Sequence, residues 1–143
     1  MGEYEDCLVF LLAKAYQKAH LIFKRKILSF GITPVQHLIL EILREEGNIS
    51  PGEIGEKGII DNATCSGVLE RMNEAGLIKR EENPEDRRSI HVSLTSKGQD
   101  LWENLDGQRK EVNEEIIRFF SMEETKVLKR MLKIIQNLQE ISN

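Results

Sequence analysis

Apolar residues recur every three or four positions along most of the chain, a spacing that places them on one face of an α-helix. In the N-terminal segment two such stripes run side by side, so we predict one long amphipathic helix from Tyr4 to Phe30 that ends at Gly31. The main stripe contains Leu8, Leu12, Ala15, Ala19 and Ile22. Two stripes on one helix indicate contacts with more than one neighbouring element.

Three capping boxes mark helix starts later in the chain, each a Ser or Thr followed three residues later by Glu or Gln. They begin at Thr33, Ser50 and Ser121, and proline follows directly in the first two. The predicted helices cover 34–46, 51–57 and 122–141. The first of them is expected to bury Leu38, Ile39, Ile42 and Leu43.

A further helix is predicted over 62–75, with Asp61 as its N-cap and Gly76 after its end. Its apolar face consists of Cys65, Val68, Leu69, Met72 and Ala75. The opposite face is small and polar in its first half, where it carries Ala63, Thr64, Ser66 and Gly67. A slim polar surface of this kind allows close approach to a groove or to another backbone.

From Leu77 to Leu94 the hydrophobic period changes from helical to alternating. We predict two strands, 78–81 and 90–94, paired as a hairpin whose polar tip is 83–88. Thr95 then caps a helix that runs to about Phe120, with Leu101, Leu105, Val112 and Ile116 at heptad-like spacing.

The 143-residue length and the 40% hydrophobic and 31% charged residues fit one folded domain. No apolar run approaches the roughly 18 to 20 residues that a membrane span needs, and the acidic start lacks the basic flank of a signal peptide. We therefore expect a cytoplasmic protein without membrane contact. In that compartment Cys7 and Cys65 are expected to stay reduced.

The order of elements is that of a winged helix-turn-helix: helix, short helix, polar-faced helix, then a hairpin with a basic tip. The predicted fold class is therefore mainly α with a small β-hairpin. We expect one domain over 1–143, in which 32–98 form the DNA-binding lobe. The segments 1–31 and 99–143 form a helical platform whose surplus apolar surface is buried by a second copy of the chain. The net charge of −4 requires DNA binding to depend on local basic clusters.

The chain resembles the MarR (multiple-antibiotic-resistance regulator) family of transcription factors. The resemblance is carried by Asp61–Ser66 leading into Leu69, Arg71 and Met72, by Gly76-Leu77-Ile78, by Asp86-Arg87-Arg88, and by Val92–Gly98. It implies a homodimer that binds a pseudo-palindromic operator, usually as a repressor, and responds to a small-molecule effector or to stress. No cofactor is expected.

The resemblance also implies roles for single residues. Arg88 matches an arginine that enters the minor groove, Asp86 matches the carboxylate that orients it, and Thr64 and Ser66 match positions that contact phosphate or bases. Asn62 and Gly67 stand where relatives often carry basic residues, which leaves fewer groove-reading side chains. The full set of expected DNA contacts is Asn62, Ala63, Thr64, Ser66, Gly67, Arg71, Asp86, Arg87 and Arg88.

Two other interpretations stay open at this point. Cys7, at the start of the first helix, could sense oxidants, although acidic neighbours disfavour its thiolate. The acidic residues Glu81, Glu82 and Glu85 beside the tip would also suit a winged-helix module that binds protein. An enzyme is not expected, because no nucleophile–base pair or phosphate loop is present. His20, His37 and His91 lack metal-ligand spacing.

Overall fold

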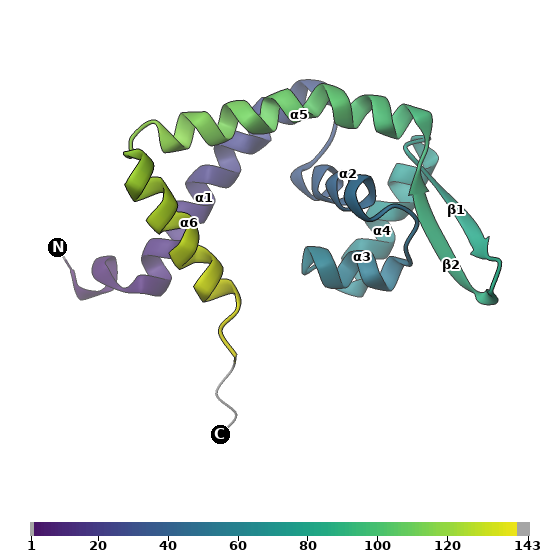
Figure 1. Ribbon diagram of the computed structural model, residues 1–143, viewed down its shortest axis with the longest axis horizontal. Coiled ribbons are helices and arrows are strands. Elements are labelled where there is room, and N and C mark those ends of the chain that lie inside the picture. The colour runs from purple at the N-terminus through teal and green to yellow at the C-terminus, as the bar shows by residue number, and fades with distance from the viewer. Residues whose placement is uncertain (1, 140–143) are drawn as a thin grey trace.

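Six α-helices and one two-stranded hairpin make up residues 2–139, the part of the chain that this computed structural model describes (Figure 1). The helices are α1 (Leu8–Ile27), α2 (Pro34–Glu46), α3 (Pro51–Gly58), α4 (Asn62–Glu74), α5 (Ser96–Ile117) and α6 (Met122–Gln136). The strands are β1 (Ile78–Asn83) and β2 (Asp86–Leu94), and two short 3-10 turns, η1 (Glu3–Asp6) and η2 (Leu28–Phe30), flank α1. The predicted fold class, mainly α with a small hairpin, is confirmed.

All three predicted capping boxes form. The hydroxyl oxygens of Thr33, Ser50 and Ser121 accept hydrogen bonds from the backbone N–H three residues later, at 3.2, 3.2 and 3.1 Å. In each box the side chain at that third position accepts from the backbone N–H of the capping residue in return. These reciprocal bonds satisfy donors that the helix itself leaves free, which explains why the three helices begin where the sequence predicts.

The predicted single helix from Tyr4 to Phe30 is wrong at both ends. Cys7 is extended, with φ −69° and ψ 129°, and separates η1 from α1. At the other end the chain tightens into η2 before Gly31 turns it with φ 72°. The last helix is also shorter than predicted: α6 ends at Gln136, and the predicted end at Ile141 lies outside the described residues.

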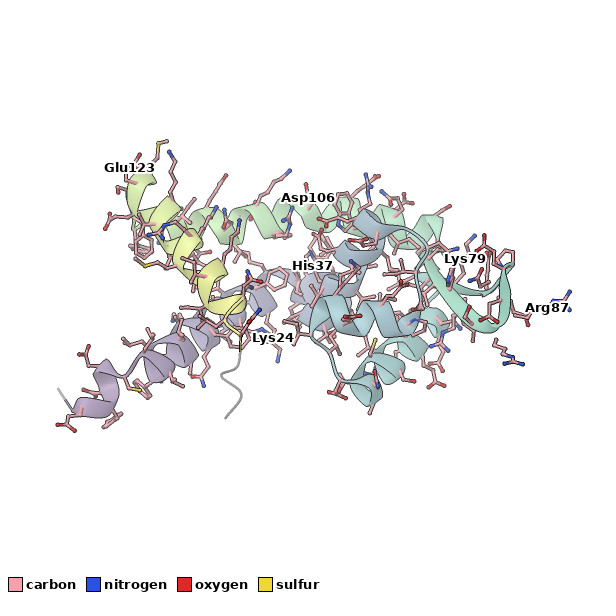
Figure 2. All side chains as sticks on the ribbon, turned by 60° about the horizontal axis from the view of Figure 1, so that its bottom comes forward. Lys24, His37, Lys79, Arg87, Asp106 and Glu123 are labelled. Carbon is pink, nitrogen blue, oxygen red and sulfur yellow. The ribbon has the colours of Figure 1, made fainter. Side chains whose placement is uncertain are left out.

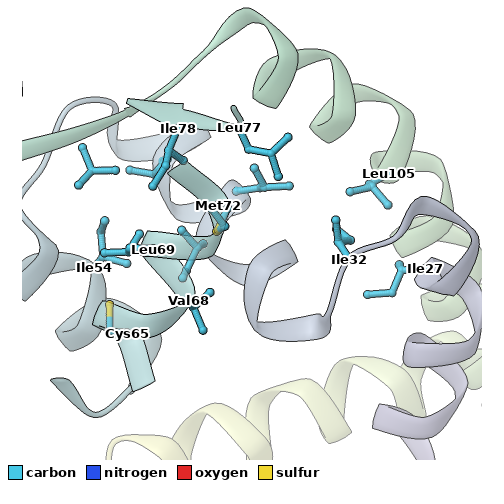
Figure 3. Packing of buried hydrophobic residues seen from close by; sticks show 14 residues of the cluster. Ile27, Ile32, Ile54, Cys65, Val68, Leu69, Met72, Leu77, Ile78 and Leu105 are labelled. Atoms are coloured by element: carbon cyan, nitrogen blue, oxygen red, sulfur yellow. The ribbon is translucent and has the colours of Figure 1, made fainter. Parts of the chain in front are cut away.

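The core lies between α2, α3, α4 and the base of the hairpin, and Figure 3 shows its packing. Ile54, Leu69, Met72 and Val92 are fully buried there. The same cluster extends to Ile27, Ile32 and Leu105, so it continues from the helix-turn-helix into α1 and α5. Burial of each such side chain contributes roughly 1.5–3 kcal/mol.

The predicted core of α2 is wrong at two positions. Leu38 is exposed and Ile42 is only half-buried, whereas Leu40, which the pattern left out, is completely buried. The reason is that α2 packs on the lobe through Ile39, Leu40 and Leu43, so Leu38 faces a groove between α2, α1 and α5.

The hairpin is joined to the lobe at its base in two ways. Ile49 exchanges two backbone hydrogen bonds with Val92, at 3.2 and 2.7 Å, and this short bridge ties the α2–α3 loop to β2. The start of α5 packs directly against the start of β1, because a Cβ added at Gly98 would lie 2.1 Å from the Leu77 carbonyl oxygen. From there α5 runs away from the hairpin toward α6 (Figure 1).

Helix α6 buries none of its residues, and much of α1 is also exposed in the single chain. Large exposed apolar residues on these two helices include Leu8, Val9, Leu11, Val127, Met131, Leu132 and Ile134. An apolar area of this extent indicates a surface that another molecule covers.

Within residues 2–139 no single helix is long and apolar enough to cross a membrane. The segments Leu8–Phe30 and Pro34–Glu46 reach that length and composition only together, and they are bent by 80°.

Candidate nucleic-acid interface

The first turn of α4 is fixed by Asp61. Its Oδ1 accepts from the Thr64 backbone N–H at 2.8 Å, and its Oδ2 accepts from the Thr64 hydroxyl at 2.7 Å. These two bonds hold the pKa of the Asp61 carboxyl below its usual value. The Thr64 hydroxyl, expected to contact DNA, is therefore already used as a donor within the cap, although its oxygen can still accept.

The two faces of α4 are arranged as the sequence predicts except at Ala75, which was expected on the apolar face but is exposed just after the helix ends. Cys65, Val68, Leu69 and Met72 are buried in the core. The opposite face leaves Asn62, Ala63, Thr64, Ser66 and Arg71 exposed, and Gly67 half-buried. A Cβ added at Gly67 would have only the Arg71 guanidinium within 4 Å, at 3.8 Å, so packing inside the chain does not require glycine there.

The hairpin tip differs from the predicted loop. Only Pro84 and Glu85 form the turn, because β2 begins at Asp86. The register passes from Glu82 opposite Ile90 to Asn83 opposite Asp86, so residues 87–89 have no partner on β1. Such a bulge redirects side chains away from the regular pleat, and Figure 2 shows Arg87 projecting beyond the end of the hairpin.

Asp86 has a different local role from the one expected. Its Oδ1 accepts from the backbone N–H of Arg88 at 3.0 Å, which stabilises the turn. Among residues 2–139 its carboxylate makes no ion pair with the Arg88 guanidinium. Asp86 thus positions Arg88 through the main chain and leaves the exposed guanidinium free to contact another molecule.

Arg80 is a candidate that the sequence analysis missed. In the regular part of the hairpin it lies opposite Val92, on the face that also carries Ile90. Arg80 and Ile90 line a hollow of about 250 Å³ together with Asn62 and Ser66 of α4. Its neighbour Lys79 points to the other face of the hairpin and pairs with Glu81 at 3.3 Å. Strand alternation is the signal that could have separated these two cations.

A second hollow, of about 580 Å³, lies between α1, α2 and α5, on the side of the lobe nearest the terminal helices. We call it the α1–α2–α5 groove. Its apolar wall includes Ala19, Phe23, Leu38, Ile42, Val112 and Ile116. Its polar residues include Tyr16, His20, His37, Glu41, Glu45, Arg109 and Asn113.

His37 is the buried polar residue of this groove, only 4% exposed. Its ring packs edge-on against the Phe23 ring, with the two ring centroids 4.9 Å apart. Burial lowers its pKa from 6.5; the charge of Glu41 opposes this shift, Arg109 adds to it and Asp106 opposes it. The His37 ring is therefore neutral at pH 7. Its Nε2 lies 3.6 Å from Glu41 Oε1, and neither atom has a hydrogen bond among the described residues.

Glu41 also links the lobe to α5. Its Oε1 forms an ion pair with Arg109 Nε at 3.1 Å, while the Arg109 NH2 group donates to Asp106 at 3.0 Å. The Arg109 guanidinium thus serves two carboxylates. The residues of this cluster lie beside each other where α2 meets the middle of α5, and Figure 2 labels His37 and Asp106 there.

The two cysteines differ in environment. Cys7 is exposed at the start of α1. Cys65 is buried in α4, its Sγ donates to the Pro51 carbonyl oxygen at 3.8 Å, and burial together with Asp61 raises its pKa. A raised pKa keeps the Cys65 thiol protonated and unreactive. Within residues 2–139 no three His, Cys, Asp or Glu side chains are grouped as a metal site.

Comparison with known proteins gives a consistent set of relatives. The model of the MarR family matches residues 32–90. The transcriptional repressor NicR of Pseudomonas putida is 32% identical over 104 residues, which span 73% of this chain and 66% of NicR, just under two thirds of that protein.

Solved structures agree over nearly the full length. A probable transcriptional regulator from Pseudomonas aeruginosa is 31% identical, with a TM-score of 0.87 over 92% of this chain and 98% of that one. BpsR of Bordetella bronchiseptica, whose DNA binding is regulated by 6-hydroxynicotinic acid, is 26% identical. Its TM-score is 0.91, over 97% of this chain and 99% of BpsR. The arrangement of α2, α3, α4 and the hairpin is thus that of a winged helix-turn-helix.

Proposed function

The chain belongs to the MarR family of transcriptional regulators, which are not enzymes, and from this premise we propose that it is a cytoplasmic, homodimeric repressor that binds a pseudo-palindromic operator. In this proposal α4 enters the major groove and the hairpin reaches the adjoining minor groove. Residues 32–98 act as the DNA-binding lobe, and 1–31 with 99–143 act as the dimer platform.

One observation carries the DNA-binding part of the proposal. Arg80 and Ile90 of the hairpin line the same hollow as Asn62 and Ser66 of α4, so the exposed side of α4 and one face of the hairpin form a continuous surface. We place Arg80 in this interface beside Asn62, Ala63, Thr64, Ser66, Gly67, Arg71, Arg87 and Arg88, with Asp86 as the residue that positions Arg88. Arg80, Arg87 and Arg88 supply the local positive charge that an acidic chain needs for binding phosphates.

The unburied apolar faces of α1 and α6 support the homodimer. Two copies joined through these helices would present two α4 helices, and a palindromic site requires them to lie about one helical turn of DNA apart, roughly 34–36 Å. The α1–α2–α5 groove is proposed as the effector site, because it lies between the platform helices and the lobe and a ligand there can bias their relative position. Regulation of BpsR by a small molecule favours this assignment.

Selection of bound duplexes from a random DNA library, followed by fluorescence anisotropy on the selected sequence, tests the proposal. We expect an inverted-repeat sequence bound by two chains, and sedimentation at micromolar concentration should give a dimer without DNA. A monomer, or a protein that selects no duplex at low salt, would refute it. The second outcome would favour a winged-helix module that binds protein.

Oxidant sensing through Cys7 is the alternative to a ligand-responsive repressor. The exposure of Cys7 is the observation that favours it. If Cys7 is the switch, stoichiometric peroxide releases DNA from the unmodified protein and not from Cys7→Ser. An equal response of both proteins would remove Cys7 from consideration.

A further inference from the structure

The two ends of α1 carry opposite charge. The 3-10 turn η1, which precedes the helix, holds three acidic residues, and the last turn of α1 holds the basic run Lys24–Lys26. Between Asp6 and Glu41 the sequence contains no acidic residue. Such a distribution suits the dipole of the helix itself. It also makes each end of α1 complementary to the opposite end of the same helix in a second copy of the chain.

Most of these charges have no partner within their own chain. Glu3 and Asp6 are exposed, and so are Lys24 and Arg25. Among the described residues none of these four side chains makes an ion pair. Lys26, by contrast, already pairs with a carboxylate of α5 at 3.5 Å. Two acidic and two basic groups therefore stay available for contact with another molecule.

The length of α1 limits how two copies can be joined. The helix has 20 residues and rises about 30 Å. Its C-terminal end leads into the lobe, and its N-terminal end lies on the side of the molecule opposite the hairpin (Figure 1). Two α1 helices that lie side by side and antiparallel therefore hold the lobes about one helix length apart. This is close to the roughly 34–36 Å that a palindromic site requires, whereas α1 helices joined end to end would separate the lobes by about 60 Å.

The charges favour the antiparallel orientation over the parallel one. Parallel α1 helices would place the two acidic ends together and the two basic ends together, and like charges repel. Antiparallel helices place each acidic end beside a basic end. Exposed apolar side chains lie near both ends, Leu8 and Val9 beside η1 and Leu21 and Leu28 beside the basic run. These side chains supply apolar area that such a contact buries.

From this arrangement we infer that α1 pairs antiparallel with α1 of a second copy, so that Glu3 and Asp6 of each chain contact Lys24 and Arg25 of the other. A two-fold axis produces the contact twice. Complementary charge of this kind selects the partner and fixes its orientation more than it adds affinity. The inference rests on the proposed function, which supplies the homodimer and the spacing of its lobes, and it adds the orientation and the charge pairing.

Two charge-reversed variants of the full-length protein test the pairing. Glu3→Lys with Asp6→Lys and Lys24→Glu with Arg25→Glu each place like charges together in their own homodimers. Each variant alone should therefore dissociate with a constant at least about tenfold higher than that of the unmodified protein. A heterodimer of the two variants restores opposite charges at both contacts.

Native mass spectrometry of an equal mixture, with one variant isotope-labelled, measures the share of heterodimer after the subunits have exchanged. Random pairing gives one half, and we expect more than about nine tenths. In 1 M salt the excess should disappear, because screening then acts within about 3 Å. Glu3→Gln with Asp6→Asn adds no repulsion, so it keeps the test valid if a reversed variant folds poorly. Its dimer dissociation constant should depend less on salt than that of the unmodified protein.

The matched control makes the same change in net charge at the other end of the molecule. Glu82→Lys with Glu85→Lys alters two exposed carboxylates of the hairpin and leaves α1 intact. Mixed with Lys24→Glu, Arg25→Glu, it should pair randomly, because a heterodimer then contains one attractive and one repulsive contact. An equal excess of heterodimer in this mixture would show that overall charge, and not the ends of α1, directs pairing.

Random pairing of the two charge-reversed variants overturns the inference, and so does an unchanged salt dependence in the neutral variant. The unmodified protein is assayed in parallel for dimer formation and for operator binding. If it dimerises and binds the operator while the reversed variants pair randomly, only the orientation and charge pairing are refuted. If it is a monomer, the proposed function fails as well.

Discussion

The assignment of Arg80 to the DNA interface can be tested by a substitution that has a matched control next to it in the sequence. Arg80→Gln removes one positive charge from the face of the hairpin that borders α4, whereas Lys79→Gln removes one from the opposite face. Both residues are exposed, so neither change disturbs the core. The two variants therefore differ in where the charge was lost and not in how much was lost.

The magnitude follows from the number of contacts. One phosphate contact per Arg80 gives two per dimer, and each contributes about 0.9 to the slope of log K against log salt concentration, so Arg80→Gln should make the slope shallower by about 1.8. Between 50 and 200 mM salt the ratio of wild-type to variant affinity should then fall by a factor of about 12. Lys79→Gln, whose ammonium is paired with Glu81, should leave the slope unchanged.

Fluorescence anisotropy on the selected operator at four or five salt concentrations measures both slopes. Equal slopes for wild type and Arg80→Gln would place Arg80 outside the interface, even if the protein binds DNA well. Equal losses in the two variants would show that only overall charge matters and that the face of the hairpin does not. Arg80→Lys separates two kinds of contact: it should restore a phosphate contact and fail to restore a bidentate contact to a base.

Three further predictions concern stability, each measured by denaturant unfolding. Gly98→Ala should lower the free energy of unfolding by about 3 kcal/mol, because its Cβ would overlap the Leu77 carbonyl oxygen; a loss below about 1 kcal/mol would mean that α5 shifts easily. For His37, whose lowered pKa keeps the folded state neutral, the free energy of unfolding should fall as pH decreases below 6.5, since only the unfolded chain takes up the proton. His37→Phe should flatten that pH dependence, and an unchanged profile would refute this origin. Ile59→Gly should raise the free energy of unfolding by about 0.5–1 kcal/mol by relieving φ 53°, whereas Ile59→Ala, which keeps a Cβ, should not.

Local signals predicted much of the fold because local bonds fix it. The three capping boxes and the Asp61 cap place four helix starts, and each depends on residues three positions apart. Four of the five residues predicted for the buried face of α4 are buried, because the helical period alone places them on one side; Ala75 is exposed because the helix ends before it.

The errors occur where a residue's surroundings come from distant segments. Leu38 and Leu40 are both apolar residues of α2, but Leu40 packs in the core whereas Leu38 lines the open groove between α1, α2 and α5, and the sequence pattern of α2 does not show which side meets the groove. The bridge between Ile49 and Val92 joins a loop residue to a strand far away in the sequence, so no periodicity reports it. Arg80 and Lys79 are adjacent cations in the sequence, and the strand register assigns them to different faces.

Helix α5 limits how a ligand in the groove could affect the DNA-contacting elements. Its first turn is fixed to the segment between α4 and β1. Thr95 Oγ1 donates to the Gly76 carbonyl oxygen, and Lys97 Nζ donates to the Ala75 carbonyl oxygen at 2.8 Å. Gly98 has no space to move toward Leu77. Farther along, the same helix contacts α2 through the pair between Arg109 and Glu41. A ligand that separates α2 from α5 must therefore break that pair or tilt α5, and a tilt of α5 carries α4 and the hairpin with it. The joint around Gly98 is tightly packed, whereas the contact around Glu41 is polar and incompletely hydrogen-bonded. We therefore expect a ligand in the groove to move the Glu41 end of α5 at a lower free-energy cost than the Gly98 end.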